Sequence, residues 1–178
     1  MRQLKPERLL WILGLALKKI IESIVIVFVL IYVVLVFDIY INTERLSKVD
    51  SSLNVYCENI ARNPKFTKGP VVFRVDRGTL IYRLTTYVYQ SGVYGYAPFF
   101  IFPHHRTVII SEKMVKSEYL DVLVAHELGH IQGGLEFLGK EKDMEKYANS
   151  FAVKVVGVER YNLYVEYCVE LSKKEPQK

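Results

Sequence analysis

The segment VLVAHELGHIQGG, residues 122–134, has the greatest bearing on the fold and function of this chain of 178 residues. It places His126 and His130 four positions apart, with Glu127 directly after the first histidine. Residues four apart lie one above the other on a helix, so both imidazole rings would point from one face. Two imidazoles presented in this way can bind one Zn²⁺ at about 2.0–2.1 Å each. Glu127 lies about 100° round the helix, where it can take a proton from a water molecule but cannot easily be a third ligand.

The competing interpretation is a chance H-E-x-x-H run in the core of a small protein. Apolar residues surround the motif, which predicts that the helix is partly buried, and burying two histidines and a glutamate without partners is costly. Gly129 leaves space beside His130, as expected near a substrate. We predict a helix capped by Ser117 and ended by Gly133 and Gly134.

The next predicted helix, residues 140–157, supplies the candidates for a third zinc ligand. Glu145 and Asn149 lie four apart on the border of its apolar stripe and can both point into the site. Glu145 would complete a set of two histidines and one glutamate, and Asn149 could hold His126 or the ligand carboxylate in place. Glu141, one turn earlier on the same face, is the alternative ligand, and the simplest alternative is that Glu145 is a solvated helix residue.

LDVLVAHELGHI (120–131) followed by EKYANSFA (145–152) resembles the gluzincin metallopeptidases, in particular the HtpX/Oma-type membrane proteases. The preceding stretch YAPFFIFPHHRTVIISEKMV (96–115) is similar to their strand pair, more weakly, so the resemblance covers residues 96–157. It implies a minimal zincin-like domain in which His126, His130 and Glu145 bind zinc. Asn149 stands where that family usually has aspartate and is similar to the asparagine of ImmA/IrrE-type proteases.

The resemblance implies a zinc-dependent endopeptidase that hydrolyses peptide bonds of a protein or peptide substrate through a zinc-bound water activated by Glu127. A strand edge near residues 107–110 or 99–102 would hold the substrate extended. A residue that stabilises the transition state is expected further along the chain, with Arg160, Tyr161 and Tyr164 as candidates. The alternative function is an inactive zinc-binding domain of the same fold that regulates or binds a partner.

Residues 20–41 form an apolar run that predicts a membrane anchor. They are about 22 residues long, roughly 33 Å as a helix, which is enough to cross a hydrocarbon layer of ~30 Å. No small residues mark a signal-peptide cleavage site after the run. Basic residues precede the run and favour a cytoplasmic N-terminus with the C-terminal part outside: Arg2, Lys5, Arg8, Lys18 and Lys19. We therefore expect a single-pass protein with an anchor segment, residues 1–41, in contact with the lipid bilayer, and a metallopeptidase domain, residues 42–178.

For residues 42–178 the pattern predicts an α+β domain with a small, mostly antiparallel sheet. We expect a helix over residues 43–60, a strand at 71–75, a second strand at 79–90 closing a hairpin, and another hairpin from 99–102 and 107–110. His104 and His105 are expected in the surface turn of that second hairpin.

The charge and the two cysteines set further limits. The formal net charge is +5, and no basic stripe with interleaved aromatic residues appears, so we expect no nucleic-acid partner. Cys57 and Cys168 have no metal-binding spacing and are predicted to be buried thiols, with a disulfide between them as the alternative.

Overall fold

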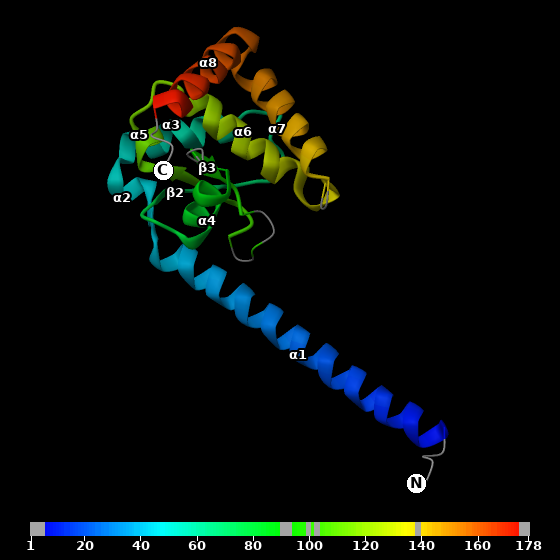
Figure 1. The fold of residues 1–178 in the computed structure, drawn as a ribbon. Coiled ribbons are helices and arrows are strands. Elements are labelled where there is room, and N and C mark those ends of the chain that lie inside the picture. Colours follow the sequence, from blue (N-terminus) through cyan, green and yellow to red (C-terminus); the bar gives the residue numbers. More distant parts are fainter. Residues whose placement is uncertain (1–5, 90–93, 99–100, 102–103, 138–139, 175–178) are drawn as a thin grey trace.

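The computed structural model describes residues 6–89, 94–98, 101, 104–137 and 140–174. It consists of a long N-terminal helix and a globular part in which helices pack on a small sheet (Figure 1). The elements are α1 (Pro6–Ile41), β1 (Thr43–Arg45), α2 (Leu46–Val49), α3 (Ser51–Ala61), β2 (Val72–Asp76), α4 (Leu80–Tyr89), β3 (Gly95–Tyr96), β4 (Thr107–Ser111), α5 (Glu112–Val115), α6 (Leu120–Gly133), the 3₁₀ turn η1 (Gly134–Phe137), α7 (Glu141–Val156) and α8 (Val158–Lys174).

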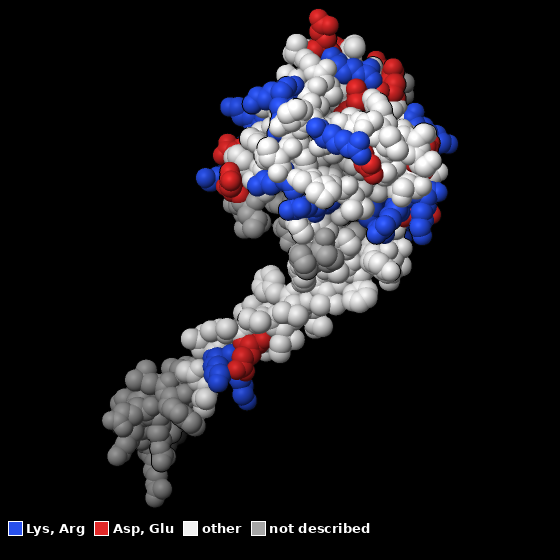
Figure 2. All heavy atoms as spheres, turned by 180° about the vertical axis from the view of Figure 1, so that it is seen from behind, with Lys and Arg blue, Asp and Glu red and all other residues white. Residues whose placement is uncertain are grey.

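Helix α1 contains a stretch, Gly14–Ile41, that is long and apolar enough to span a membrane, with a mean hydropathy of 3.1. Its side chains between residues 23 and 37 carry no charge, as Figure 2 shows between the charged residues near its far end and the globular part. Lys18 and Glu22 form an ion pair of 3.8 Å on this helix. The long apolar helix agrees with the predicted anchor. Which side of the membrane each end of the chain faces stays a prediction.

The sheet has the strand order β1-β2-β4-β3 and is mixed. Its two outer pairs are antiparallel and its central pair, β2 with β4, is parallel, with Val72 opposite Thr107 and Asp76 opposite Ser111. The prediction of a mostly antiparallel sheet therefore holds for the outer pairs and is wrong for the central pair. The parallel pair arises because α4 and β3 lie between β2 and β4 in the chain, giving a crossover connection where a hairpin was expected.

Strand β4 is buried on both faces of the sheet, which explains its continuous apolar sequence. Val108 and Ile110 point into the main core under α3 and α6, whereas Ile109 points to the opposite face. On that opposite face Ile109 meets Ile39 from α1 and Ile81 from α4. The sheet therefore lies between the histidine-bearing helix α6 and the end of α1.

The prediction of one helix over residues 43–60 is wrong at its start. Thr43 and Glu44 belong to strand β1, and the helical part is broken at Asp50, whose carboxylate accepts a hydrogen bond of 2.9 Å from the Leu53 backbone N–H. Asp50 is thus the N-cap of α3. Residues 43–45 form a strand because they pair with β2, although the apolar residues after them have helical spacing.

The predicted strand at residues 79–90 is a helix, α4, through Tyr89. Asp76 accepts hydrogen bonds from the backbone of Gly78 at 2.6 Å and of Thr79 at 3.0 Å, and the Thr79 hydroxyl accepts one from the Tyr82 N–H at 3.2 Å. Thr79 therefore starts the helix as its N-cap. The Asp-Arg-Gly sequence that suggested a hairpin turn is part of this helix start.

The predicted second hairpin is replaced by pairing of β3 with β4, in which Gly95 lies opposite Ile110. Residues 99, 100 and 102 of the predicted strand at 99–102 lie outside the described residues. Since β4 pairs with β2 on one side, and its residues Ile109 and Ile110 pair with β3 on the other, the expectation of a substrate-binding edge at residues 107–110 is wrong for these two residues. The outer strand on this side of the described sheet is β3.

The two helices predicted to carry the site are present with nearly the predicted bounds. Helix α6 begins at Leu120, slightly later than a Ser117 cap would place it, because the Ser117 hydroxyl bonds to the Tyr119 N–H at 3.2 Å instead. It ends at Gly133, followed by Gly134 with a φ of 57°, as expected for a helix stop. Helix α7 follows after η1.

Candidate metal centre

Helices α6 and α7 cross with their backbones in close contact at Gly129. A Cβ atom on Gly129 would lie 2.7 Å from the Ala148 Cα and 3.1 Å from the Phe151 Cβ. Space at Gly129 was expected to admit substrate, but it admits the backbone of α7. This close approach brings Glu145, one turn before Ala148, up to the two histidines.

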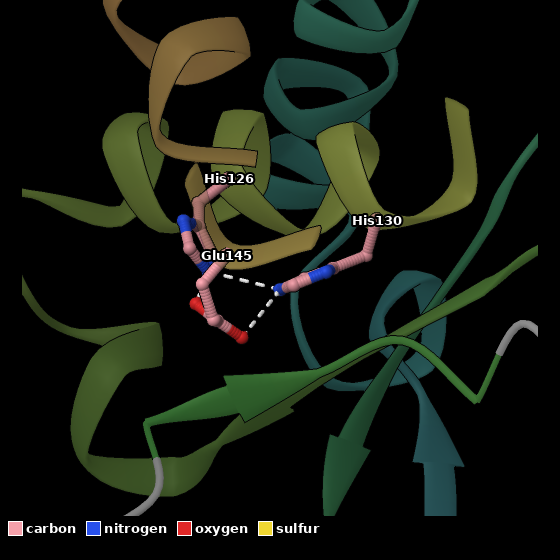
Figure 3. A group of neighbouring side chains, drawn as sticks. All are labelled: His126, His130 and Glu145. Carbon is pink, nitrogen blue, oxygen red and sulfur yellow. Dashed lines mark hydrogen bonds and ion pairs between the residues drawn. The ribbon is translucent and has the colours of Figure 1, made fainter. Parts of the chain in front are cut away.

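His126, His130 and Glu145 converge as the sequence predicts. Figure 3 shows both rings and the carboxylate pointing toward one another on one side of α6. The two Nε2 atoms are 3.1 Å apart, the His126 Nε2 is 3.5 Å from the Glu145 Oε2, and the His130 Nε2 is 3.4 Å from the Glu145 Oε1. One atom from each residue lies within 4.8 Å of the others, a grouping that could hold a metal ion.

The spacing of these atoms fits a tetrahedral zinc site. Two ligands at about 2.1 Å from a tetrahedral ion lie roughly 3.4 Å from each other. The distance between the two Nε2 atoms, 3.1 Å, is near that value, and each ring lies at a similar distance, 3.4 or 3.5 Å, from one of the two Glu145 oxygens. Two imidazoles and one carboxylate also match the ligand set of catalytic zinc sites, which leave a fourth position open.

The ionisation of the three side chains is strongly linked. Burial alone would lower the pKa of His126, but the hydrogen bond with Glu145 and the Glu127 charge outweigh it and raise this pKa. Burial and the neighbouring His126 charge lower the pKa of His130 to about 4. The hydrogen bond with His126 lowers the pKa of Glu145.

Glu127 lies beside this cluster, with only 4% of its surface exposed. Burial raises its pKa to about 7, against the opposing effects of the His126 charge and a backbone hydrogen bond from Ala97. Its Oε2 has no hydrogen-bond partner among the described residues. A buried carboxylate oxygen without a partner is costly, and such groups in native proteins often serve catalysis or bind an ion or water.

Asn149 lies next to His126, where its side chain helps to raise the pKa of that histidine. This agrees with its predicted place behind a ligand. The Nδ1 of His130 is buried and has no partner among the described residues. The side chain of Glu141, the alternative ligand, lies outside the described residues.

Arg160 is not placed as a catalytic residue. Its guanidinium pairs with Asp121 through Nε and Nη2, at 3.1 and 3.2 Å, and donates to the Glu118 carbonyl. It also lies over the Tyr119 ring, 4.8 Å from its centre. These contacts hold α8 on the start of α6.

Tyr161 and Tyr164 lie nearer to the site. Burial is the main cause of the raised pKa of both tyrosines. The Glu145 charge also contributes to the raised pKa of Tyr161, and the Glu127 charge contributes to that of Tyr164. Their rings are tilted against each other at 6.4 Å. Both therefore stay candidates for stabilising a transition state.

An open hollow of about 750 Å³ runs along α7 from the ligand candidate Glu145. Its lining includes Asn149 and three lysines, Lys142, Lys146 and Lys154. It thus joins the metal centre to a positively charged surface.

Two further predictions have clear outcomes. His104 is buried, with its Nε2 3.3 Å from the Val36 carbonyl of α1, so it does not lie in a surface turn. Cys57 and Cys168 are free thiols, Cys57 buried and Cys168 partly buried, so the alternative of a disulfide is not seen.

Comparisons of the chain with protein-family models, with curated proteins and with solved structures found no match.

Proposed function

We propose that the protein is a membrane-anchored zinc endopeptidase. The observation that carries this proposal is the buried carboxylate of Glu127, whose Oε2 has no hydrogen-bond partner among the described residues. It lies beside His126, His130 and Glu145, a group that could hold a metal ion. A purely structural metal site would not need such a carboxylate. The resemblance of residues 96–157 to gluzincins supports the same function.

His126, His130 and Glu145 would hold the ion, with Asn149 keeping His126 in position. A bound Zn²⁺ supplies polarisation of the substrate carbonyl and lowers the pKa of a coordinated water toward ~7. Glu127 accepts the proton of the attacking water and passes it to the leaving amine. Burial raises the pKa of Glu127 in the metal-free protein, and the charge of a bound ion would lower it again.

The substrate chain is proposed to lie along the outer edge of β3, paired through main-chain hydrogen bonds. The backbone of Ala97, directly after β3, is bonded to Glu127, which joins this edge to the catalytic carboxylate. The hollow along α7 would accept substrate side chains, and its lysines favour acidic ones.

The anchor is proposed to be residues 20–41 of α1, in a single pass with the N-terminus in the cytoplasm and the domain outside. The basic residues before the run support this orientation. A reporter enzyme fused to the C-terminus, active only on one side of the membrane, tests it; activity in the cytoplasm would reverse the orientation.

The central experiment uses the full chain in nanodiscs and measures zinc content together with cleavage of casein and of matched acidic and basic peptides. Glu127→Gln should keep near-stoichiometric zinc and lose about 10²–10⁴-fold in cleavage rate, the usual contribution of a general base. Glu166→Gln, an exposed glutamate on α8, is the control and should keep both. Zinc without cleavage in the parent chain would instead favour the inactive regulator, and a chain without zinc would contradict both.

A further inference from the structure

We propose that α4 and the last turns of α1 lie together in the lipid headgroup layer, so that the domain rests on the bilayer. This inference rests on the membrane anchor of the proposed function and is independent of peptide-bond cleavage.

The last turns of α1 have two different faces. Leu35, Val36 and Ile39 pack against the domain, and Ile39 is fully buried there. On the other face the apolar side chains Phe37, Tyr40 and Ile41 are 60%, 69% and 71% exposed. A span over residues 20–41, roughly 33 Å long, needs lipid around this exposed face. The domain therefore contacts one face of α1 at the same depth in the bilayer at which the opposite face of α1 meets lipid.

Helix α4 is fixed at this same level. The Leu80 N–H donates to the Asp38 carboxylate at 2.7 Å, and the Asn42 side chain donates to its other oxygen at 2.8 Å. Ile81 packs into the cluster around Ile39. Figure 1 shows α4 at the end of the domain nearest to α1.

The start of α4 has the properties of an interfacial helix. Leu80 and Leu84, four apart and hence on one face, are 39% and 52% exposed. Arg83 lies between them in sequence and is exposed. Exposed leucines with a basic neighbour favour a position at the boundary between headgroups and acyl chains.

Charge at the junction also suits a phospholipid surface. Arg45 and Arg74 are directly opposite each other on β1 and β2. Arg74 also donates to the Thr43 carbonyl at 2.8 Å, close to the end of α1. The nearby Glu44 is already paired with Arg77 at 3.1 Å, so it does not neutralise them. Anionic headgroups attract such arginines.

Fluorescence quenching in nanodiscs of phosphatidylcholine and phosphatidylglycerol tests this arrangement. The full chain, with Cys168→Ser and the buried Cys57 retained, carries a fluorophore at Leu84→Cys, Leu163→Cys or Val27→Cys. Leu163 on α8 is 48% exposed and matches Leu84 in residue type and exposure. Val27 lies in the middle of the anchor. Quenching is measured with a headgroup-proximal doxyl lipid and with aqueous iodide.

We expect the doxyl lipid to quench Leu84 about threefold more than Leu163, because an interfacial helix face lies ~5–10 Å into the boundary. Iodide should show the reverse order. If Leu84 behaves like Leu163 while Val27 is quenched by lipid, the domain does not rest on the bilayer and the anchor still stands. If Val27 is accessible to iodide, the anchor is wrong and this inference fails with it.

Discussion

Glu145 is the residue that joins α7 to the two histidines of α6, and its carboxylate reaches both rings. We expect Glu145→Gln to weaken zinc binding by more than about 100-fold, the upper end of the ~10–100-fold loss seen when an outer partner is removed. Competition with a chelating indicator measures this affinity. Glu141→Gln is the control, and a zinc loss that followed Glu141 instead would contradict the ligand assignment.

The two cysteines differ in burial. Burial raises the pKa of Cys57 to about 12 and also raises that of Cys168, which is only partly buried. A raised pKa means less reactive thiolate at a given pH, so both should react slowly and faster as the pH rises. Cys168 should be alkylated first and Cys57 only on unfolding, as mass spectrometry of iodoacetamide-treated protein can show. Equal labelling of both in the folded chain would contradict the described packing of Cys57.

At the residue scale the spacing of the sequence was enough to predict that His126 and His130 lie on one face of a helix, because helical periodicity is a local property. Glu145 lies on another helix, and its approach to the histidines depends on the crossing of α6 and α7 at Gly129. The burial of Glu127 and its contact with Ala97 depend on how the sheet meets α6, and no local pattern reports that. Arg160, a candidate from the sequence, instead pairs with Asp121, 39 positions earlier, which no local pattern reports either.

The crossing of α6 and α7 is the element-scale feature that assembles the site. Gly129→Ala would place a methyl group against the α7 backbone at 2.7 Å, which cannot move aside easily. Overpacking costs about 1–3 kcal/mol, whereas the better helix propensity of alanine returns about 1 kcal/mol. We expect a net loss of up to about 2 kcal/mol in the free energy of unfolding, together with weaker zinc binding.

Gly133→Ala, one turn further along α6, is the matched control for this prediction. Its Cβ would meet only ring atoms of Phe137, at 3.0 Å, and of Tyr147, at 3.3 Å. Side chains can shift, so its unfolding free energy in urea should change little or rise. A similar loss in both variants would show that the close backbone contact is not the cause.

The sequence predicted α6, α7 and the strands β2 and β4 because their patterns agree with their final environment. It was wrong at residues 79–90, where β-branched and aromatic residues suggested a strand. The Asp76 and Thr79 side chains cap a helix there, and packing of Ile81 against α1 holds it. Whether such a segment forms a strand or a helix depends on the residues that it packs against in the folded protein, and its own sequence does not show which residues these are.

At the scale of the whole molecule, the end of α1 is part of the domain core. Ile39 is fully buried whereas Ile41, two positions later, is 71% exposed. We expect Ile39→Ala to destabilise the domain by about 2–4 kcal/mol through the cavity it leaves, and Ile41→Ala to have little effect. Urea unfolding of the full chain in detergent, followed by circular dichroism, compares them. Equal stability of the two variants would mean that the helix end is not part of the core.

An apolar stretch long enough for a membrane span could be predicted at residues 20–41, because this is a property of composition, whereas α1 itself begins earlier, at Pro6. The packing of Leu35, Val36 and Ile39 into the domain could not be predicted, because their partners lie far along the chain. A fragment beginning at residue 42 would leave Ile101 and Ile109 without their cover from α1. Functional measurements are therefore best made on the full chain.

Only Asn42 separates α1 from β1, and its backbone is bonded on both sides, to the Asp38 carbonyl and from the Arg77 N–H, each at 2.8 Å. The junction contains no flexible linker, so we expect the domain to move together with α1 when the tilt of the helix in the membrane changes. Spanning helices lean further when the surrounding bilayer is thinner than their apolar length. Under the proposed function, membrane thickness would then change the tilt of the domain over the lipid, and with it the part of a neighbouring protein that His126, His130 and Glu145 face.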